Sequence, residues 1–192
     1  MVCANVFVRK GDHVLVLRRS PDRQYAANVV HPVGGKVDRD ENPYVAAVRE
    51  VWEETGLRVR NMRLEAVLLD IAPVPHEPLN WLVYHFSADY VDGEPHQTDE
   101  GELIWLTAKQ LTSQPLHPSL QGIVQDILDR RTGTLFITHR YDSTGQQISR
   151  RNKDTCTLAH PEPLRWRRFL RWRRFVRSSP RQSDDITGIN SA

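Results

Sequence analysis

Residues 35–57 read GKVDRDENPYVAAVREVWEETGL, and this stretch carries the strongest structural signal in the chain. Asn42 is a favourable N-cap, and Pro43 suits the first helical position, where a missing N–H group costs nothing. Gly56 stands where a helix commonly ends, because glycine accepts the left-handed conformation there. The stretch therefore predicts a loop that leads into a helix over residues 43–55.

The predicted helix has two sides of different character. At about 100° per residue, its larger uncharged side chains fall on one side: Tyr44, Val48, Val51, Trp52 and Thr55. Glu50, Glu53 and Glu54 fall on the other side as neighbours three and four positions apart. We expect the uncharged side to pack on a sheet and the acidic side to face a cleft.

Three glutamates on one side of a helix repel one another. Each such pair costs about 0.2–0.5 kcal/mol, and the negative end of the helix dipole adds to the penalty. Arg49 can offset part of it by pairing with Glu41 or Glu53, and a divalent cation would offset more. Mg²⁺ prefers oxygen ligands and binds through a few carboxylates together with substrate phosphates. The cluster predicts a Mg²⁺ site, with Mn²⁺ as a substitute; a solvated acidic face held by arginine pairs is the alternative.

The same stretch resembles the signature of the Nudix hydrolases, Gly-x5-Glu-x7-Arg-Glu-U-x-Glu-Glu-x-Gly-U, in which U is aliphatic. Every specified position is matched, by Gly35, Glu41, Arg49, Glu50, Val51, Glu53, Glu54, Gly56 and Leu57. The resemblance implies a Mg²⁺-dependent hydrolase that cleaves a diphosphate linked to another group, usually a nucleoside. It also implies an α/β fold, an α/β/α sandwich around a mixed sheet, and it extends over roughly residues 2–150. Val33 stands where the family often has a proline before the two glycines.

The resemblance also implies roles for individual residues. Glu50, Glu53 and Glu54 match metal ligands, and Gly34 would add a backbone carbonyl. Arg49 would orient the glutamates. The general base stays open between Glu53 and Glu100, since Glu100 matches a loop that supplies another acidic ligand. Glu102 is a weaker candidate for that ligand.

A second group of residues is predicted to contact the substrate. Lys36 and the backbone N–H of Gly35 would touch phosphate. Arg18 and Arg19 end a predicted strand whose arginines lie near the substrate in similar family members. Asn28, together with Tyr25, lies on the loop before the site and could contact base or ribose.

The order of segments after residue 99 resembles family members that act on oxidised purine nucleotides. We therefore expect a nucleoside triphosphate such as 8-oxo-dGTP to be cleaved to the monophosphate and pyrophosphate. Pro73, placed 16 residues after Leu57, favours the alternative of an ADP-ribose or nucleotide-sugar pyrophosphatase. A nucleotide-sensing binding module is a further alternative, which the intact signature disfavours. Trp81, Trp105 and His31 are predicted to be structural rather than catalytic or base-stacking.

The flanking segments predict the rest of the domain. Residues 2–9 and 13–18 form a predicted hairpin that turns at residues 10–12. Further strands are predicted within 62–71, 81–90 and 101–106, and one strand followed by a turn is predicted over residues 134–145. Helices are predicted near 108–111 and over 119–130.

The charge of the chain is unevenly distributed. Residues 1–159 hold 18 basic and 21 acidic side chains, whereas residues 160–192 hold eight arginines against three acids. The tail repeats RWRRFL as RWRRFV at residues 165–176. We expect a Nudix domain over residues 1–150 and a basic, partly disordered tail over 151–192. Through residues 164–177 the tail would bind an anionic membrane surface or nucleic acid, or it has no specific role.

Two cysteines, Cys3 and Cys156, form no disulfide framework and no zinc motif. No run of 18 apolar residues and no signal-peptide core are present. These features predict a reducing, cytoplasmic setting, and they leave the oligomeric state open.

Overall fold

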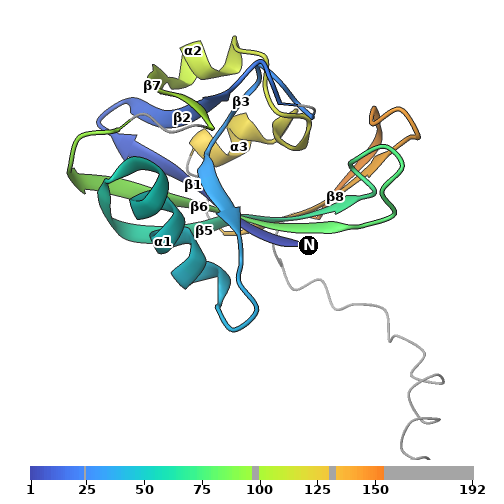
Figure 1. The fold of residues 1–192 in the computed structure, drawn as a ribbon, viewed down its shortest axis with the longest axis horizontal. Coiled ribbons are helices and arrows are strands. Elements are labelled where there is room, and N and C mark those ends of the chain that lie inside the picture. The colour runs from blue at the N-terminus through green and yellow to red at the C-terminus, as the bar shows by residue number, and fades with distance from the viewer. Residues whose placement is uncertain (24, 97–99, 130–132, 154–192) are drawn as a thin grey trace, which may run out of the picture. The chain divides into compact units, whose positions relative to one another are not determined.

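The computed structural model describes residues 1–23, 25–96, 100–129 and 133–153 (Figure 1). The expected basic segment 164–177 lies outside the described residues. The strands are β1 Val2–Lys10, β2 His13–Arg19, β3 Val30–His31, β4 Val33–Lys36, β5 Arg58–Ile71, β6 Trp81–Asp92, β7 Gly101–Thr107, β8 Leu135–Tyr141 and β9 Gln147–Lys153. The helices are α1 Pro43–Thr55, α2 Ala108–Thr112, the 3-10 turn η1 Pro118–Leu120, and α3 Val124–Leu128.

Strand β1 is the branch point of a mixed sheet. One edge of β1 pairs in parallel with β6 along its length. Its other edge pairs first with β4, through Cys3–Val6, and then with β2, through Val8–Lys10. β2 continues to β7, whereas β6 continues through β5 and β8 to β9. Because β4 and β2 share this edge of β1, the strand β4, which carries Gly34 and Gly35, lies within the sheet beside β2.

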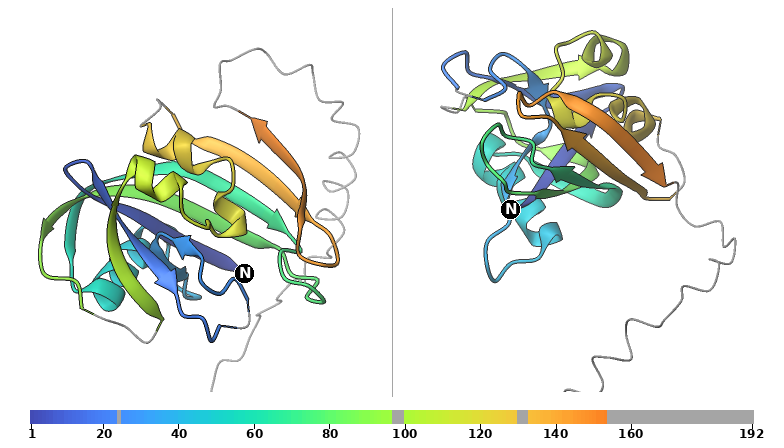
Figure 2. Two further views of the ribbon diagram at one scale, coloured as in Figure 1. Left: turned by 90° about the horizontal axis from the view of Figure 1, so that it is seen from above. Right: turned by 90° about the vertical axis from the view of Figure 1, so that its right-hand side faces the viewer.

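Helices cover both faces of this sheet, which confirms the expected α/β class (Figure 2). Side chains alternate along β1 as strand geometry requires. Ala4, Val6 and Val8 are buried in the core beneath α1, whereas Phe7 is buried in the core beneath α2, η1 and α3. Each face of β1 thus belongs to a separate apolar core.

The expected orientation of α1 is wrong in part. Val51 and Thr55 are buried, but Tyr44, Val48 and Trp52 are 53%, 43% and 56% exposed. The buried positions include instead the small residues Ala46 and Ala47. Small side chains allow α1 to approach β4 closely, so the larger uncharged residues turn outward. The glutamates consequently lie toward β4, next to the buried side of the helix.

The expected helix over residues 119–130 is also wrong in extent. The segment begins as the 3-10 turn η1, and only Val124–Leu128 is α-helical. Gly122 separates the two with a φ of 76°, which ends helical geometry at that point. The last strand, β9, was not predicted and pairs antiparallel with β8. In the described residues, no helix has the length and apolarity needed to span a membrane.

Candidate active site

The signature stretch folds as a strand, a loop and a capped helix. The Asn42 side chain accepts hydrogen bonds from the backbone N–H groups of Tyr44 and Val45, both at 3.0 Å. At the other end, Gly56 adopts a φ of 69° and its N–H donates to the Trp52 carbonyl. The predicted bounds 43–55 are therefore confirmed, and both caps have the predicted chemistry.

The two glycines of β4 allow the glutamates to approach the backbone. A Cβ at Gly35 would lie 2.6 Å from each carboxylate oxygen of Glu50, so no other residue fits without moving that carboxylate. The N–H of Gly34 donates to Glu54 Oε2 at 3.0 Å. A Cβ at Gly34 would collide with the Ala4 carbonyl oxygen. Glycine at both positions is therefore what holds the acidic side of α1 against β4.

Arg49 joins the loop to the acidic side of the helix. Its Nε and Nη2 donate to the two carboxylate oxygens of Glu41 at 3.0 and 2.8 Å. Its Nη1 donates to Glu50 and to Glu53, both at 2.9 Å. Nη2 also donates to the Lys36 carbonyl at 3.1 Å. The guanidinium therefore fixes the relative positions of three carboxylates and the end of β4, which matches the orienting role that the resemblance implies.

The electrostatic environment differs among these carboxylates. Burial raises the pKa of Glu54 to about 7, against a lowering effect of the Gly34 hydrogen bond, and nearby carboxylates raise it further. Burial likewise raises the pKa of Glu50, while Arg49 opposes the shift. The Arg49 hydrogen bonds lower the pKa of Glu41. Two desolvated carboxylates that repel each other are groups that a cation would stabilise in the ionised form.

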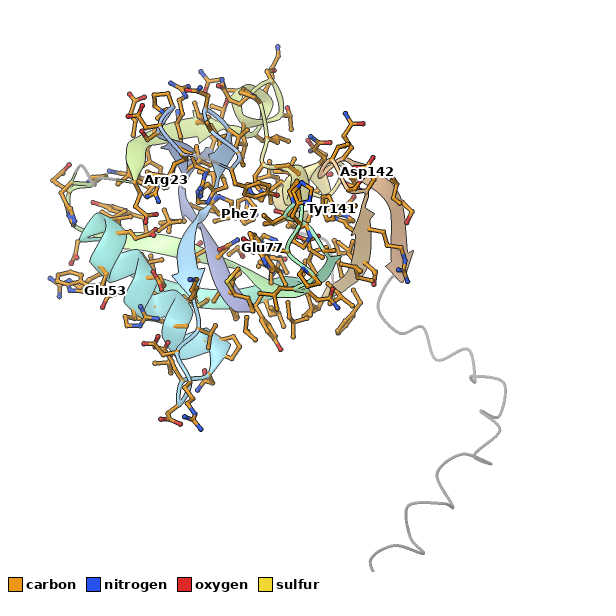
Figure 3. The ribbon with its side chains drawn as sticks, turned by 45° about the vertical axis from the view of Figure 1, so that its right-hand side comes forward. Phe7, Arg23, Glu53, Glu77, Tyr141 and Asp142 are labelled. Atoms are coloured by element: carbon orange, nitrogen blue, oxygen red, sulfur yellow. The ribbon has the colours of Figure 1, made fainter. Side chains whose placement is uncertain are left out.

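The remaining acidic candidates lie at the edge of this cluster. The Glu53 side chain is 55% exposed. In Figure 3 it lies at the left, and Tyr141 and Asp142 lie at the right. Glu100 pairs with Arg23 at 3.2 Å, and its charge contributes to the raised pKa of Glu54. Glu102 pairs instead with Arg18.

The predicted metal ligands are oxygen donors, the type that a hard divalent cation prefers. They are the carboxylates of Glu50, Glu53 and Glu54 and the backbone carbonyl of Gly34. In the described part of the chain, no three acidic, histidine or cysteine side chains are already arranged around one point as ligands. The absence of a side chain at Gly35 leaves room for the Glu50 carboxylate against the strand, where it would serve as one of the ligands of a divalent cation.

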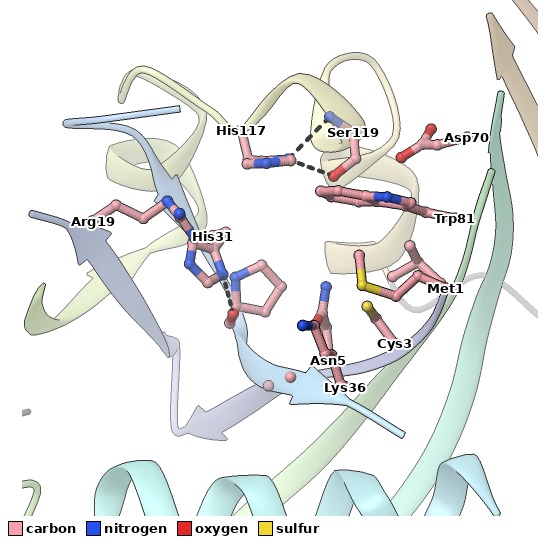
Figure 4. Close-up of a pocket in the computed structure, with 14 residues that line it drawn as sticks. Met1, Cys3, Asn5, Arg19, His31, Lys36, Asp70, Trp81, His117 and Ser119 are labelled. Atoms are coloured by element: carbon pink, nitrogen blue, oxygen red, sulfur yellow. Dashed lines mark hydrogen bonds between the residues drawn. The ribbon is translucent and has the colours of Figure 1, made fainter. Parts of the chain in front are cut away.

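A cavity of about 160 Å³ borders the glycine strand (Figure 4). Among the predicted residues, Gly34, Gly35, Lys36, His31 and Trp81 line it. Arg19, predicted to lie near the substrate, and Pro32, in the predicted phosphate loop, also line it. Sequence patterns did not indicate its other lining residues, Met1, Cys3, Asn5, Asp70, Val83, His117 and Ser119. They come from separate strands and loops, and no local motif connects them.

Two predicted substrate contacts lie elsewhere. Arg18 does not line this cavity; it donates to Glu102 at 3.2 Å and to Gln114 at 3.3 Å. Arg19, the other arginine predicted to lie near the substrate, does line it. Asn28 is exposed in the loop before β3 and is not part of the lining. Tyr25 packs edge-on against the cavity residues Trp81 and His117.

The two tryptophans have different surroundings. Trp105 is partly buried against the core beneath α1 and packs edge-on against Tyr90. Trp81 is partly buried against the other core and also lines the cavity. Both contribute to packing, and Trp81 in addition presents aromatic surface to the site.

Solved structures with this architecture are Nudix proteins. The MutT protein from Bacillus halodurans superposes with a TM-score of 0.68 at 26% identity, covering 79% of this chain and 97% of that protein. MutT from Burkholderia pseudomallei superposes with a TM-score of 0.56 at 27% identity, covering 68% and 97%. The fold and the acidic helix on a glycine strand thus define a Nudix-type hydrolase.

Sequence comparison gives the same assignment. Residues 1–127 match the NUDIX domain family. "Putative 8-oxo-dGTP diphosphatase 2" of Mycobacterium tuberculosis is 32% identical over 141 residues, which cover 73% of this chain and 96% of the relative. "NAD-capped RNA hydrolase NudC" of Pseudomonas aeruginosa is 34% identical over 131 residues, 67% of this chain. The aligned region spans only 44% of NudC. The chain belongs to the Nudix family, whose members act on nucleotide-containing substrates and generally use divalent metal ions.

Proposed function

We propose that this protein catalyses the Mg²⁺-dependent hydrolysis of a nucleoside triphosphate such as 8-oxo-dGTP to the monophosphate and pyrophosphate. The observation that carries the proposal is the position of Glu50 and Glu54. Both carboxylates lie against the backbone of β4, and the same glycines line the cavity. A nucleoside held in the cavity would extend its phosphates along β4 toward the glutamates.

The residues around β4 have complementary tasks in such a reaction. When bound, divalent ions neutralise the diphosphate and activate the attacking water. Glu50, Glu53, Glu54 and the Gly34 carbonyl would hold them. Lys36 lines the cavity at the end of β4, where its ammonium group can bind a phosphate oxygen and stabilise charge that develops in the transition state.

Two carboxylates remain candidates for the general base. Glu53 is exposed beside Glu50 and shares Arg49 with it. Glu100 approaches from the loop before β7 and is held by Arg23. Either group is accessible to water, which a base that accepts a proton from the nucleophile requires.

The choice of a purine triphosphate over other diphosphates has two supports. One is the relative from Mycobacterium tuberculosis, which aligns over 96% of its length. The other is the cavity, which is bordered by an aromatic ring and polar side chains suited to a base. Pro73, the residue that favoured ADP-ribose, is not among the lining residues.

A dinucleotide-type substrate is the second candidate. It is favoured by the relatives named NAD-capped RNA hydrolase, which share 34% identity over the aligned region. ADP-ribose and nucleotide sugars belong to the same chemical class, since each joins two groups through a diphosphate. The large part of NudC that has no counterpart in the alignment makes this candidate the weaker one.

A substrate panel in ¹⁸O-labelled water tests the proposal. It contains 8-oxo-dGTP, the common nucleoside triphosphates, ADP-ribose and NAD, each with and without Mg²⁺. We expect turnover only with the metal and preferential cleavage of 8-oxo-dGTP, with the label showing which phosphorus is attacked. Preferential cleavage of ADP-ribose or NAD would favour the second candidate. Binding of nucleotides without turnover would indicate a binding module.

A further inference from the structure

Asp70 lines the cavity and has one buried carboxylate oxygen without a hydrogen-bond partner among the described residues. The side chain comes from β5 and the residue is 1% exposed. Its Oδ1 accepts a hydrogen bond from the Tyr141 hydroxyl at 3.0 Å and lies 3.3 Å from His139 Nδ1. Within the described residues, nothing donates to Oδ2. A buried carboxylate oxygen normally has a donor, so the missing partner points to a ligand.

His31 lines the same cavity and also has a buried side-chain atom without a hydrogen-bond partner in the described part of the chain. Its Nδ1 lies 2.6 Å from the Pro32 carbonyl, which can only accept, so the proton is assigned to Nδ1. Nε2 then carries a lone pair, and it has no partner among the described residues. Burial lowers the pKa of His31 to about 4, which keeps the ring neutral near pH 7.

The two acceptors come from different sides of the cavity. His31 belongs to β3 and Asp70 to β5, and β2, β1 and β6 lie between these strands in the sheet. Figure 4 shows the Asp70 carboxylate pointing toward Ser119 above the Trp81 ring, with His31 and Arg19 across the cavity. A flat ligand against Trp81 would therefore present one edge to Asp70 and another to His31.

We propose that Asp70 and His31 determine base specificity by accepting N–H donors from opposite edges of an oxidised guanine held against Trp81. The inference rests on the proposed function, since it names how that site would recognise its substrate. Neither residue belongs to the Nudix signature, and each was left with an unused acceptor atom by the fold.

The Asp70 side of the cavity favours guanine over adenine. Guanine carries two adjacent donors, N1–H and the 2-amino group, and a carboxylate accepts both. Adenine carries one amino group beside the N1 lone pair, which a carboxylate repels. The hydrogen bond from Tyr141 orients the carboxylate without using Oδ2. Asp70 is therefore matched to the edge that distinguishes guanine.

The His31 side favours the 8-oxo form. Ordinary guanine has a lone pair at N7, which would face the lone pair of Nε2. Oxidation at C8 places a hydrogen on N7 and so converts that atom into a donor. Arg19 lies beside His31 in Figure 4, and its buried Nε has no hydrogen-bond partner within the described residues. That N–H group can donate to a carbonyl next to N7.

Three nucleotides separate these contributions without altering the protein. The kcat/KM for dGTP should exceed that for dITP, which lacks only the 2-amino group, by at least about tenfold. The kcat/KM for 8-oxo-dGTP should exceed that for dGTP by at least about tenfold, because only the oxidised base donates from N7. Equal rates for dGTP and dITP would overturn the role of Asp70, and equal rates for 8-oxo-dGTP and dGTP would overturn that of His31.

Two variants assign each preference to its residue. Asp70→Asn should bring the dGTP to dITP ratio close to one, and His31→Leu should do the same for the ratio of 8-oxo-dGTP to dGTP. Asp92→Asn, which changes an exposed carboxylate paired with Arg58, should preserve both ratios. A variant that melts as the wild type does and keeps the ratio it should lose would contradict the proposal. Should a variant fail to fold, the nucleotide comparison on the wild type still decides.

Binding of the monophosphates separates this inference from the proposed function. Calorimetry with 8-oxo-dGMP, dGMP and dIMP needs no turnover, and we expect affinity to fall in that order. Absence of triphosphate hydrolysis together with this order would reject the catalytic proposal and support base recognition. Turnover of triphosphates with equal affinity for the three monophosphates would reject base recognition and leave the catalytic proposal standing.

Discussion

Gly35 and Glu50 are in direct contact, since a Cβ at Gly35 would lie 2.6 Å from both carboxylate oxygens of Glu50. Because Gly35 has no positive φ, this contact rather than backbone conformation requires glycine at the position. The strand and the helix that carry these residues belong to the same core beneath α1. Any side chain at position 35 would therefore act on the acidic cluster directly.

Gly35→Ala should lower kcat by about a hundredfold, because the Glu50 carboxylate must move on the order of 1 Å. The melting temperature should change little, since the carboxylate is the end of a flexible side chain. Gly11→Ala provides the matched control. Gly11 has a φ of 64° and open space around its Cβ position, so alanine there should cost about 1 kcal/mol of stability without affecting kcat. Wild-type kcat in Gly35→Ala would contradict the assigned position of Glu50.

Glu54→Gln and Glu53→Gln should each lower kcat by several orders of magnitude while the fold persists. Glutamine at position 54 can still accept the Gly34 hydrogen bond, so circular dichroism and the melting temperature should be unchanged. Glu77→Gln, in the exposed loop between β5 and β6, should keep wild-type kinetics. Near wild-type rates in both active-site variants would mean that the metal site has been assigned to the wrong residues.

Arg49→Lys should lower kcat/KM by about tenfold to a hundredfold, the usual effect of losing a partner that orients metal ligands. A single ammonium group cannot donate at once to Glu41, Glu50, Glu53 and the Lys36 carbonyl, as the guanidinium does. The Arg49→Lys variant should also need a higher Mg²⁺ concentration for half-maximal activity. Unchanged kinetics in this variant would show that the hydrogen bonds of the Arg49 guanidinium have no role in positioning the carboxylates.

His85 should make stability depend on pH. The residue is fully buried beside Phe7, and burial lowers its pKa to about 3. The unfolded chain binds a proton near pH 6.5 whereas the folded chain does not, so folding is favoured above pH 6.5 and this contribution is lost as the pH falls toward 3. From pH 7 to pH 5 the expected loss is about 2 kcal/mol.

Urea unfolding of the wild type and His85→Phe at pH 7 and pH 5 measures this contribution. The phenylalanine variant should lose about 2 kcal/mol less than the wild type over that interval. His76→Phe, at an exposed loop position, should show the wild-type difference. Equal losses in the wild type and His85→Phe would show that folding does not lower the pKa of His85.

The signature helix was predictable because its determinants are local. Asn42 and Gly56 fix its two ends, and the predicted bounds are confirmed. The spacing of the glutamates places their carboxylates on one side of the helix. The direction that α1 faces was not predictable from its own residues. Ala46 and Ala47 are buried in a core that includes Ala4 and Val33 from the separate strands β1 and β4, so the buried side of α1 depends on residues outside the helix.

The cavity shows the same limit for the site. Lys36 and His31 are next to the signature glycines, so their proximity to the site could be inferred from the sequence. Asp70 and His117 reach the cavity only because β5 and the segment before η1 are brought to it by the branched sheet. No spacing in the sequence predicts that these residues lie at the cavity. The break at Gly122 was not predicted either, because the pattern over residues 119–130 is typical of one helix.

Calorimetry of Mg²⁺ or Mn²⁺ binding to the full chain, with and without 8-oxo-dGMP, shows whether the acidic cluster holds a metal. We expect saturable uptake of the metal by the wild type, strengthened by the nucleotide and strongly weakened in Glu50→Gln and Glu54→Gln. Absence of uptake by the wild type, with the nucleotide as well as without it, would contradict the claim that these carboxylates hold a divalent cation for phosphate chemistry.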